Sequence, residues 1–377
     1  MRIAFAVILS VALSLTSERC RGQSRAVSLE KGKDVAGKTH PKKAKHAASS
    51  SLRLVPVDRI KVASEAAGVF YDPLKCDIDG NLYTRTDSDG VSGIRKLNTK
   101  GERVALFQAS TAIPDLNGKI DFAADFSIAQ NGEVYQLAFT SGEIDRHVFV
   151  YKPDGNYKSK IKLQPGFAWN PARVSAFSSG DLVTGLKYDR EGKAMWPFTG
   201  IFSSDGTLMK EVTLKDDKGI RDMGVSADKR VTSPENPTSN RAVSWGATEG
   251  AADGNVYVMR RLSPAIFYAI SPGGEVVRRF TLDPGRSDFM PMDMHIAGNR
   301  IAVLFYESKD TPEPVKEAVV KVIDLKGHVL ATYEEAKENG NLTLGLSLAC
   351  YSINPERFTF LTTTEDEKLE IDIAEPR

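Results

Sequence analysis

Short apolar stretches alternate with glycine turns along most of this chain, and the alternation itself repeats. In each repeat an apolar stretch leads into a first turn, often Asp-Gly-Asn, and a second stretch with apolar residues at every other position leads on towards another glycine turn. First turns lie at 77–83, 129–135, 178–183, 252–258 and 297–303, and second turns at 98–104, 152–158, 203–209, 271–277 and 324–330. Alternation with a period of two predicts half-buried strands, and Asp-Gly-Asn supplies the positive φ of tight hairpins.

The repeat length indicates how these hairpins are assembled. Turns of the same kind recur about every 50 residues, the period of β-propeller blades that contain several short strands each. One interval is longer because a polar run rich in Pro, Asn and Ser is inserted at 215–241. That run is predicted to be a long surface loop.

The two ends of the repeat region complement each other. Five repeats end near residue 335, and a sixth at 342–364 is followed by the strand candidate KLEIDI at 368–373, but no fourth strand follows. The segment LRLVPVDRIKVA at 52–63 precedes the first repeat and can pair with the last, which removes two open sheet edges. The prediction is an all-β, six-bladed β-propeller over 51–377, closed by an N-terminal strand added to the last blade.

The first 50 residues differ in character from the rest. Arg2 precedes an apolar stretch at 3–15 that is too short to cross a bilayer comfortably, which is typical of a secretory signal peptide, here assigned to 1–26. An uncleaved membrane anchor is the alternative. Residues 27–50 are rich in lysine and poor in large apolar residues, which predicts a basic disordered tether, either a solvated spacer or a contact to an anionic surface. We therefore expect a secreted or periplasmic protein with no transmembrane segment after cleavage.

The charge distribution narrows the choice of partner. The chain of 377 residues has 50 Lys and Arg against 49 Asp and Glu, and the basic excess lies in the N-terminal segment. The folded part is therefore mildly acidic, which argues against a nucleic-acid surface. We expect a monomer whose partner is a protein, peptide or glycan of the cell envelope.

Two cysteines fall in the folded part, and Cys20 falls in or just after the leader. Cys76 lies four residues before the turn glycine Gly80 in the first repeat, and Cys350 lies four residues before Asn354, which replaces the glycine in the last repeat. If the repeats close into a ring, the two are neighbours, and an exported protein would allow a disulfide. The alternative is a pair of buried thiols that behave as small apolar residues.

The turn pattern, Asp-x-x-Gly-Asn-x-Tyr followed by a strand and then Asp-x-x-Gly, resembles the repeat of NHL-type and TolB-like six-bladed propellers over 51–377. The resemblance implies the fold but no single activity, because that broad group includes lyases, lactonases, sugar-binding proteins and protein-docking modules. It also implies that a ligand site would lie at the mouth of the central channel.

Candidate site residues follow from the innermost strand, which we expect just before each first turn. Positions five and seven residues before the glycine of the first turn, or before Asn354 in the last repeat, face the same way along a strand. They are Lys75, Ser127, Ser175, Glu249, Asp293 and Ala349, and Pro73, Asp125, Arg173, Ala247, Pro291 and Ser347. The charged members could bind a polar ligand or Ca²⁺, or could neutralise one another. Trp169, Trp245 and the Met-rich run that contains His295 could add a stacking face, or could simply fill a blade.

Histidine usage argues against zinc chemistry. The folded part contains His147, His295 and His328, and the last directly follows a turn glycine, so too few remain for the multi-histidine site of amidating lyases that share this fold. Glu65 could imitate the first metal ligand of gluconolactonase-like propellers, but its Asn partners cannot be placed. The prediction is an exported, non-catalytic binding scaffold without a cofactor. The alternative is a calcium-dependent lyase or lactonase that uses Asp125, Glu249 and Asp293.

Overall fold

The computed structural model describes residues 52–62, 70–88, 91–108, 120–140, 146–177, 179–188, 195–215, 243, 246–307, 317–338, 341–344, 347–363 and 369–377. The predicted signal peptide and tether, Glu65, Trp245 and almost all of the predicted 215–241 loop lie outside these residues. No described helix is long and apolar enough to cross a membrane.

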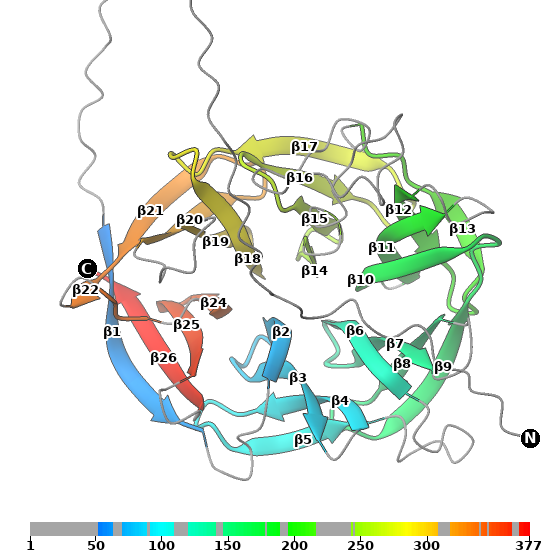
Figure 1. Ribbon diagram of the computed structural model, residues 1–377, viewed down its shortest axis with the longest axis horizontal. Helices are drawn as coiled ribbons and strands as arrows, with labels where there is room; N and C mark the ends of the chain where they lie inside the picture. Colours follow the sequence, from blue (N-terminus) through cyan, green and yellow to red (C-terminus); the bar gives the residue numbers. More distant parts are fainter. Residues whose placement is uncertain are drawn as a thin grey trace, which may run out of the picture. The chain divides into compact units, whose positions relative to one another are not determined.

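The elements of the described residues are all β-strands, as the alternating pattern predicts. Four sheets contain four antiparallel strands each, in sequence order (Figure 1). They are β2 (Phe70–Cys76), β3 (Leu82–Ser88), β4 (Val91–Leu97) and β5 (Arg103–Phe107); β6 (Ile120–Ile128), β7 (Val134–Thr140), β8 (Arg146–Tyr151) and β9 (Tyr157–Leu163); β10 (Trp169–Phe177), β11 (Gly180–Tyr188), β12 (Met195–Phe202) and β13 (Leu208–Glu211); and β14 (Ala247–Gly250), β15 (Val256–Arg260), β16 (Ala265–Ile270) and β17 (Val276–Leu282).

The remaining strands form one larger sheet and one small hairpin. The larger sheet has eight strands in the order β18-β19-β20-β21-β1-β26-β25-β24. Its members are β18 (Phe289–Ala297), β19 (Arg300–Glu307), β20 (Ala318–Asp324), β21 (Val329–Glu335), β1 (Leu52–Lys61), β26 (Leu369–Pro376), β25 (Glu356–Thr363) and β24 (Ser347–Ile353). The hairpin pairs β22 (Lys337–Glu338) with β23 (Asn341–Leu342).

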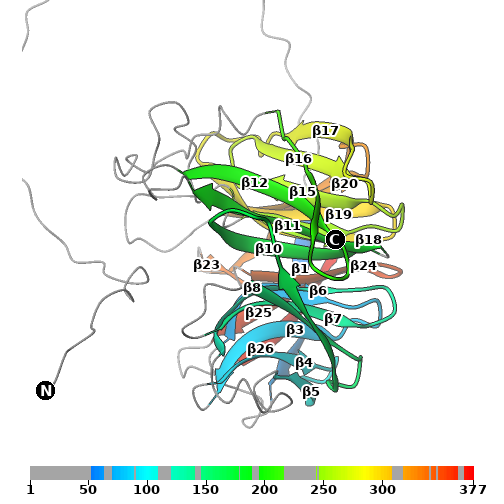
Figure 2. The ribbon, with the colours of Figure 1, turned by 90° about the vertical axis from the view of Figure 1, so that its right-hand side faces the viewer.

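The sheets are arranged around a common centre, which makes the fold a β-propeller. Figure 1 shows β2, β6, β10, β14, β18 and β24 nearest that centre, and each of these strands contacts the next one around the ring. The prediction that the innermost strand precedes each first turn is therefore confirmed. Seen from the side, the strands run across the thickness of the ring (Figure 2), so connections of the same kind gather at the same end.

The beginning and the end of the chain meet in the eight-stranded sheet. Strand β1 pairs antiparallel with β26, from Leu54 opposite Pro376 to Lys61 opposite Glu370, as expected for the segments 52–63 and 368–373. Over Leu52–Leu54 it also pairs in parallel with β21. Leu54 is fully buried in the apolar cluster that this arrangement creates. The N-terminal strand therefore contributes a side chain to the core and also covers the edge of β26.

Apolar side chains fill the spaces between neighbouring sheets. Phe126 on β6, for example, is fully buried and lies 6.5 Å from Tyr83 of the preceding sheet, measured between ring centroids. Trp169, which could have offered a stacking face, instead stacks on Phe202 at 5.5 Å within such a cluster. Trp169 is therefore a core residue.

The first turns are of two lengths, which the glycine count does not reveal. In three sheets the last paired residues of the inner strand lie four positions before the turn glycine, as Cys76 does before Gly80. In two others the hairpin is tighter, with Phe177 paired directly to Gly180 and Ala297 to Arg300. Positions counted back from the glycine are therefore not equivalent in all repeats, so comparing them across repeats is not justified.

Candidate functional site

The inner strands carry β-bulges at the positions of the predicted site residues. The pairing register shifts between Ala123 and Asp125 on β6, between Pro171 and Arg173 on β10, and between Pro291 and Met294 on β18, where Asp293 lies. A bulge places an extra residue in one strand and re-aims the neighbouring side chains. The proline in two of these segments is consistent with a bulge, because proline cannot donate to a continuous ladder.

The predicted carboxylates bind the main chain of the next inner strand. The Val174 N–H donates to Oδ2 of Asp125 (2.8 Å), and the Ile296 N–H donates to Oε2 of Glu249 (3.1 Å). The Leu348 N–H donates in the same way to Oδ2 of Asp293 (3.0 Å). In each case the acceptor lies on one inner strand and the donor on its successor around the ring.

The predicted cations make the reciprocal contacts to carbonyl groups. Nε of Arg173 donates to the Gly246 carbonyl at 2.6 Å, which connects β10 to the start of β14. The ammonium of Lys75 donates to the Phe126 carbonyl on β6 and lies 3.4 Å from Oδ1 of Asp125. These charged side chains are therefore fixed by hydrogen bonds to main-chain groups, and Lys75 and Asp125 are also fixed by their contact with each other.

Lys75 also reaches beyond its nearest neighbour. Its Nζ lies 3.4 Å from the carbonyl oxygen of Thr248 on β14, a strand that is not adjacent to β2 in the ring. The Lys75 side chain is only 13% exposed. Its ammonium therefore joins three inner strands, β2, β6 and β14, at the centre of the ring.

Glu249 and His295 have pKa values moved by their surroundings. Burial raises the pKa of Glu249 to about 8, although Lys75 and the Ile296 N–H oppose the change. The Glu249 residue as a whole is only partly buried, but burial of its carboxyl group is the largest cause of the raised pKa. Burial lowers the pKa of His295 to about 4, and Lys75 adds to that effect. At neutral pH both groups are therefore uncharged in the folded protein.

The tautomer of His295 follows from its contact. Its Nε2 lies 2.7 Å from the Leu348 carbonyl oxygen, which can only accept, so Nε2 carries the proton. Its Nδ1 is then a buried acceptor with no hydrogen-bond partner among the described residues. Ser175 Oγ, which is fully buried on β10, likewise has no hydrogen-bond partner in the described part of the chain.

The structure thus brings Lys75, Asp125, Glu249 and His295 together, and we call these four residues the central polar cluster. Arg173 and Asp293 lie outside this cluster and bind main-chain groups of the next inner strand or its start. Trp245 lies outside the described residues. Within the described part of the chain, no three His, Cys, Asp or Glu side chains stand together in a way that would hold a metal ion.

Two uncharged residues take part that the sequence did not single out as ligands. The Ala176 N–H donates to Ser127 Oγ at 3.2 Å, and the Thr248 hydroxyl donates to the Val174 carbonyl at 3.2 Å. Both lie on inner strands and are buried. Ser127 lies at one of the compared positions and Thr248 directly precedes Glu249, but neither carries the charge on which the prediction depends.

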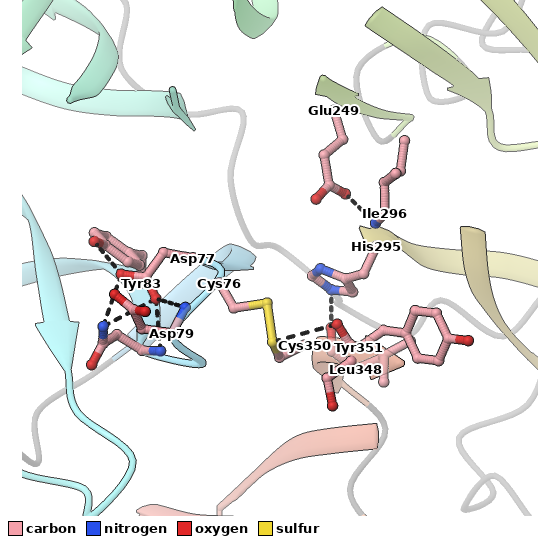
Figure 3. Close-up of a disulfide and its surroundings, with 12 residues drawn as sticks. Cys76, Asp77, Asp79, Tyr83, Glu249, His295, Ile296, Leu348, Cys350 and Tyr351 are labelled. Atoms are coloured by element: carbon pink, nitrogen blue, oxygen red, sulfur yellow. Dashed lines mark hydrogen bonds between the residues drawn. A yellow bond between two sulfur atoms is a disulfide. The ribbon is translucent and has the colours of Figure 1, made fainter. Parts of the chain in front are cut away.

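A disulfide joins the first and last inner strands. Cys76 on β2 and Cys350 on β24 are bonded, with their Cα atoms 5.3 Å apart, which is the first of the two alternatives set out above. Figure 3 shows the disulfide beside the contact between His295 and Leu348, with Glu249 nearby. The covalent junction is therefore next to the central polar cluster.

Comparisons with known proteins add little to this geometry. No family model matches the chain, so the resemblance to the NHL-type repeat is not shown, and no curated protein matches its sequence. Similar solved structures include a protein of unknown function from Bacteroides caccae (11% identity, 70% of this chain and 80% of that one, TM-score 0.41) and the propeller of Dos1 (10%, 78% and 75%, TM-score 0.39). A subtype N10 neuraminidase-like protein of A/little yellow-shouldered bat/Guatemala/060/2010 is also similar (8%, 85% and 99%, TM-score 0.40). At these values the likenesses support no statement about activity.

Proposed function

We propose that this protein is an exported, non-catalytic binding scaffold with six blades. Two blades are counted in the eight-stranded sheet, β18–β21 and β24–β26 completed by β1. The reason is that β1 pairs with β26 along most of its length but meets β21 only over Leu52–Leu54, in parallel, whereas the strands within every other blade are antiparallel. The disulfide fits an oxidising compartment outside the cytoplasm.

The observation that carries the proposal is the use made of the charged residues. Asp125, Glu249 and Asp293 each hold an N–H of the neighbouring strand, and Lys75 lies against Asp125. Carboxylates engaged in this way stabilise a framework, whereas calcium requires several oxygen ligands directed at one point. These contacts favour the scaffold over the calcium-dependent lyase or lactonase.

The ligand, a protein, peptide or glycan segment of the cell envelope, is proposed to bind at one end of the ring. Tight glycine turns, such as the one between β2 and β3, connect strands at one end. The described connections between one sheet and the next, such as 164–168 between β9 and β10 and 283–288 between β17 and β18, join strand ends at the other end. Binding residues concentrate on loops that a rigid framework positions.

The test uses the full-length chain purified in its oxidised form. Soluble peptidoglycan fragments and a displayed peptide library serve as probes, and amide hydrogen exchange is measured with and without a bound probe. We expect protection in the connections 164–168 and 283–288, at the end where the sheets are connected, and none in the turns 271–275 and 325–328. Protection confined to the tight turns would contradict the proposed binding end. Calcium-dependent conversion of a lactone or uronate probe would contradict the non-catalytic assignment.

A further inference from the structure

Each inner strand is tied to its successor, and one tie differs in kind from the others. Around the ring the bonds run from side chain to main chain, through Lys75, Asp125, Arg173, Glu249, and the pair Asp293 and His295. Between β24 and β2, where the ring closes, the tie is the disulfide Cys76–Cys350. Among these ties it is the one that can be opened by electron transfer without a change of pH.

The two sulfur atoms differ in access. Cys76 is half-buried at the end of β2, whereas Cys350 is 5% exposed. A thiolate of a dithiol reductant would therefore attack Sγ of Cys76 and displace the Cys350 thiolate, which takes up a proton. The second thiol of the reductant then attacks the mixed disulfide and releases Cys76. Overall, two electrons and two protons reach the protein, and the dithiol becomes a cyclic disulfide.

The position of Cys76 connects this chemistry to the centre of the ring. Lys75 precedes it on β2, and the Lys75 ammonium holds the Phe126 carbonyl, Asp125 and the Thr248 carbonyl. The disulfide fixes the end of the strand from which that side chain projects. If the bond opens, the end of β2 can move, and the main-chain position from which the Lys75 side chain projects is no longer fixed.

We propose that Cys76–Cys350 is a redox latch that holds Lys75 in the central polar cluster. In the oxidised protein the ammonium joins β2, β6 and β14. In the reduced protein the inner ends of β2 and β24 separate and Lys75 becomes accessible, while the ring stays closed. Two features keep it closed: the apolar cluster that contains Leu74, Leu82 and Ile371, and the pairing of β1 with β26. The proposal concerns the unliganded protein and does not depend on the binding function proposed above.

The experiment compares the oxidised full-length chain with the same chain treated with dithiothreitol. Amide hydrogen exchange is measured by mass spectrometry, and lysine acetylation by an activated ester is measured in parallel. We expect amides in 70–76 and 347–353 to exchange at least about tenfold faster after reduction, with little change in β8. We also expect acetylation of Lys75 to rise at least about fivefold, while the exposed Lys326 reacts at the same rate in both states.

A matched variant separates reduction from other effects of the reagent. The double substitution Cys76→Ser and Cys350→Ser should show the fast exchange without dithiothreitol and should not respond to it. If that variant does not fold, the reduced wild-type chain still decides the question. Unchanged exchange and unchanged Lys75 acetylation after confirmed reduction would overturn the proposal, and so would faster exchange spread over all sheets, because a latch acts locally.

Discussion

Replacement of Glu249 by Gln is expected to change how stability depends on pH. Glu249 lies on the innermost strand of its sheet and accepts the Ile296 N–H through Oε2. Gln has nearly the same shape and keeps an oxygen acceptor for that bond, but it does not titrate. The substitution therefore removes the ionisation of this group with little change in packing.

The size and sign of the effect follow from the pKa of Glu249. Burial raises it from 4.5 to about 8, so between these values the folded protein keeps a proton that the unfolded chain releases. Stability from this group is therefore present at low pH and is lost as the pH rises towards about 8. At about 1.4 kcal/mol for each pKa unit, the ceiling is about 5 kcal/mol. Because the residue as a whole is only partly buried, we expect about 1–3 kcal/mol.

The assay is urea denaturation of the wild-type chain and the Glu249→Gln variant at pH 5 and pH 9. We expect similar free energies of unfolding at pH 5, and a variant about 1–3 kcal/mol more stable than wild type at pH 9. Glu275→Gln is the matched control, because its side chain is 62% exposed and should give no such gain. A Glu249→Gln curve that runs parallel to wild type across the range would refute the buried, neutral carboxyl.

Three further substitutions test the core, a turn and the second buried titratable group. Leu54→Ala should cost about 2–5 kcal/mol in urea denaturation because Leu54 is fully buried, whereas Leu52→Ala, at a position 44% exposed, should cost less than about 0.5 kcal/mol. Gly206→Ala should lower the melting temperature more than Gly254→Ala. Both have positive φ, but only at Gly206 would a Cβ meet a main-chain oxygen, at 1.9 Å; equal losses would show that the turn relaxes. His295→Gln should reduce the loss of stability between pH 6.5 and about 4, where wild type keeps this ring neutral, and an unchanged acid profile would contradict that state.

Much of the fold could be predicted from the sequence because strand periodicity and glycine turns are local signals. The strand segments and the pairing of the two chain ends followed from those signals together with the avoidance of open edges. The equivalence of positions across repeats could not be predicted, because it depends on turn length and on bulges. Gly80 and Gly180 look alike in sequence, yet the inner strand ends at a different distance from each.

The candidate site was predicted as a set of residues but not in its role. Lys75, Asp125, Glu249 and His295 do meet at the centre, because inner strands must place some side chains there. Whether such side chains face a ligand or a neighbouring strand depends on distances of a few ångströms between segments far apart in the chain. Asp125 and Val174, for example, meet only after two sheets have folded, and no local pattern records that contact.

A physical requirement of the ring explains why charged residues recur on its inner strands. The innermost strand of each sheet has one edge that pairs with no strand of its own sheet. The N–H and C=O groups on that edge point towards the centre of the ring, where neighbouring inner strands bury them and where unsatisfied groups are costly. The Val174, Ile296 and Leu348 N–H groups are such donors, and the carboxyl groups of Asp125, Glu249 and Asp293 on the preceding strands satisfy them. Carbonyl groups at the same edges accept hydrogen bonds from the cations of Lys75 and Arg173 and, at Val174, from the Thr248 hydroxyl. Ionisable residues near the axis of a propeller are therefore not in themselves a sign of a ligand site, because they can satisfy the main-chain groups at the inner edges.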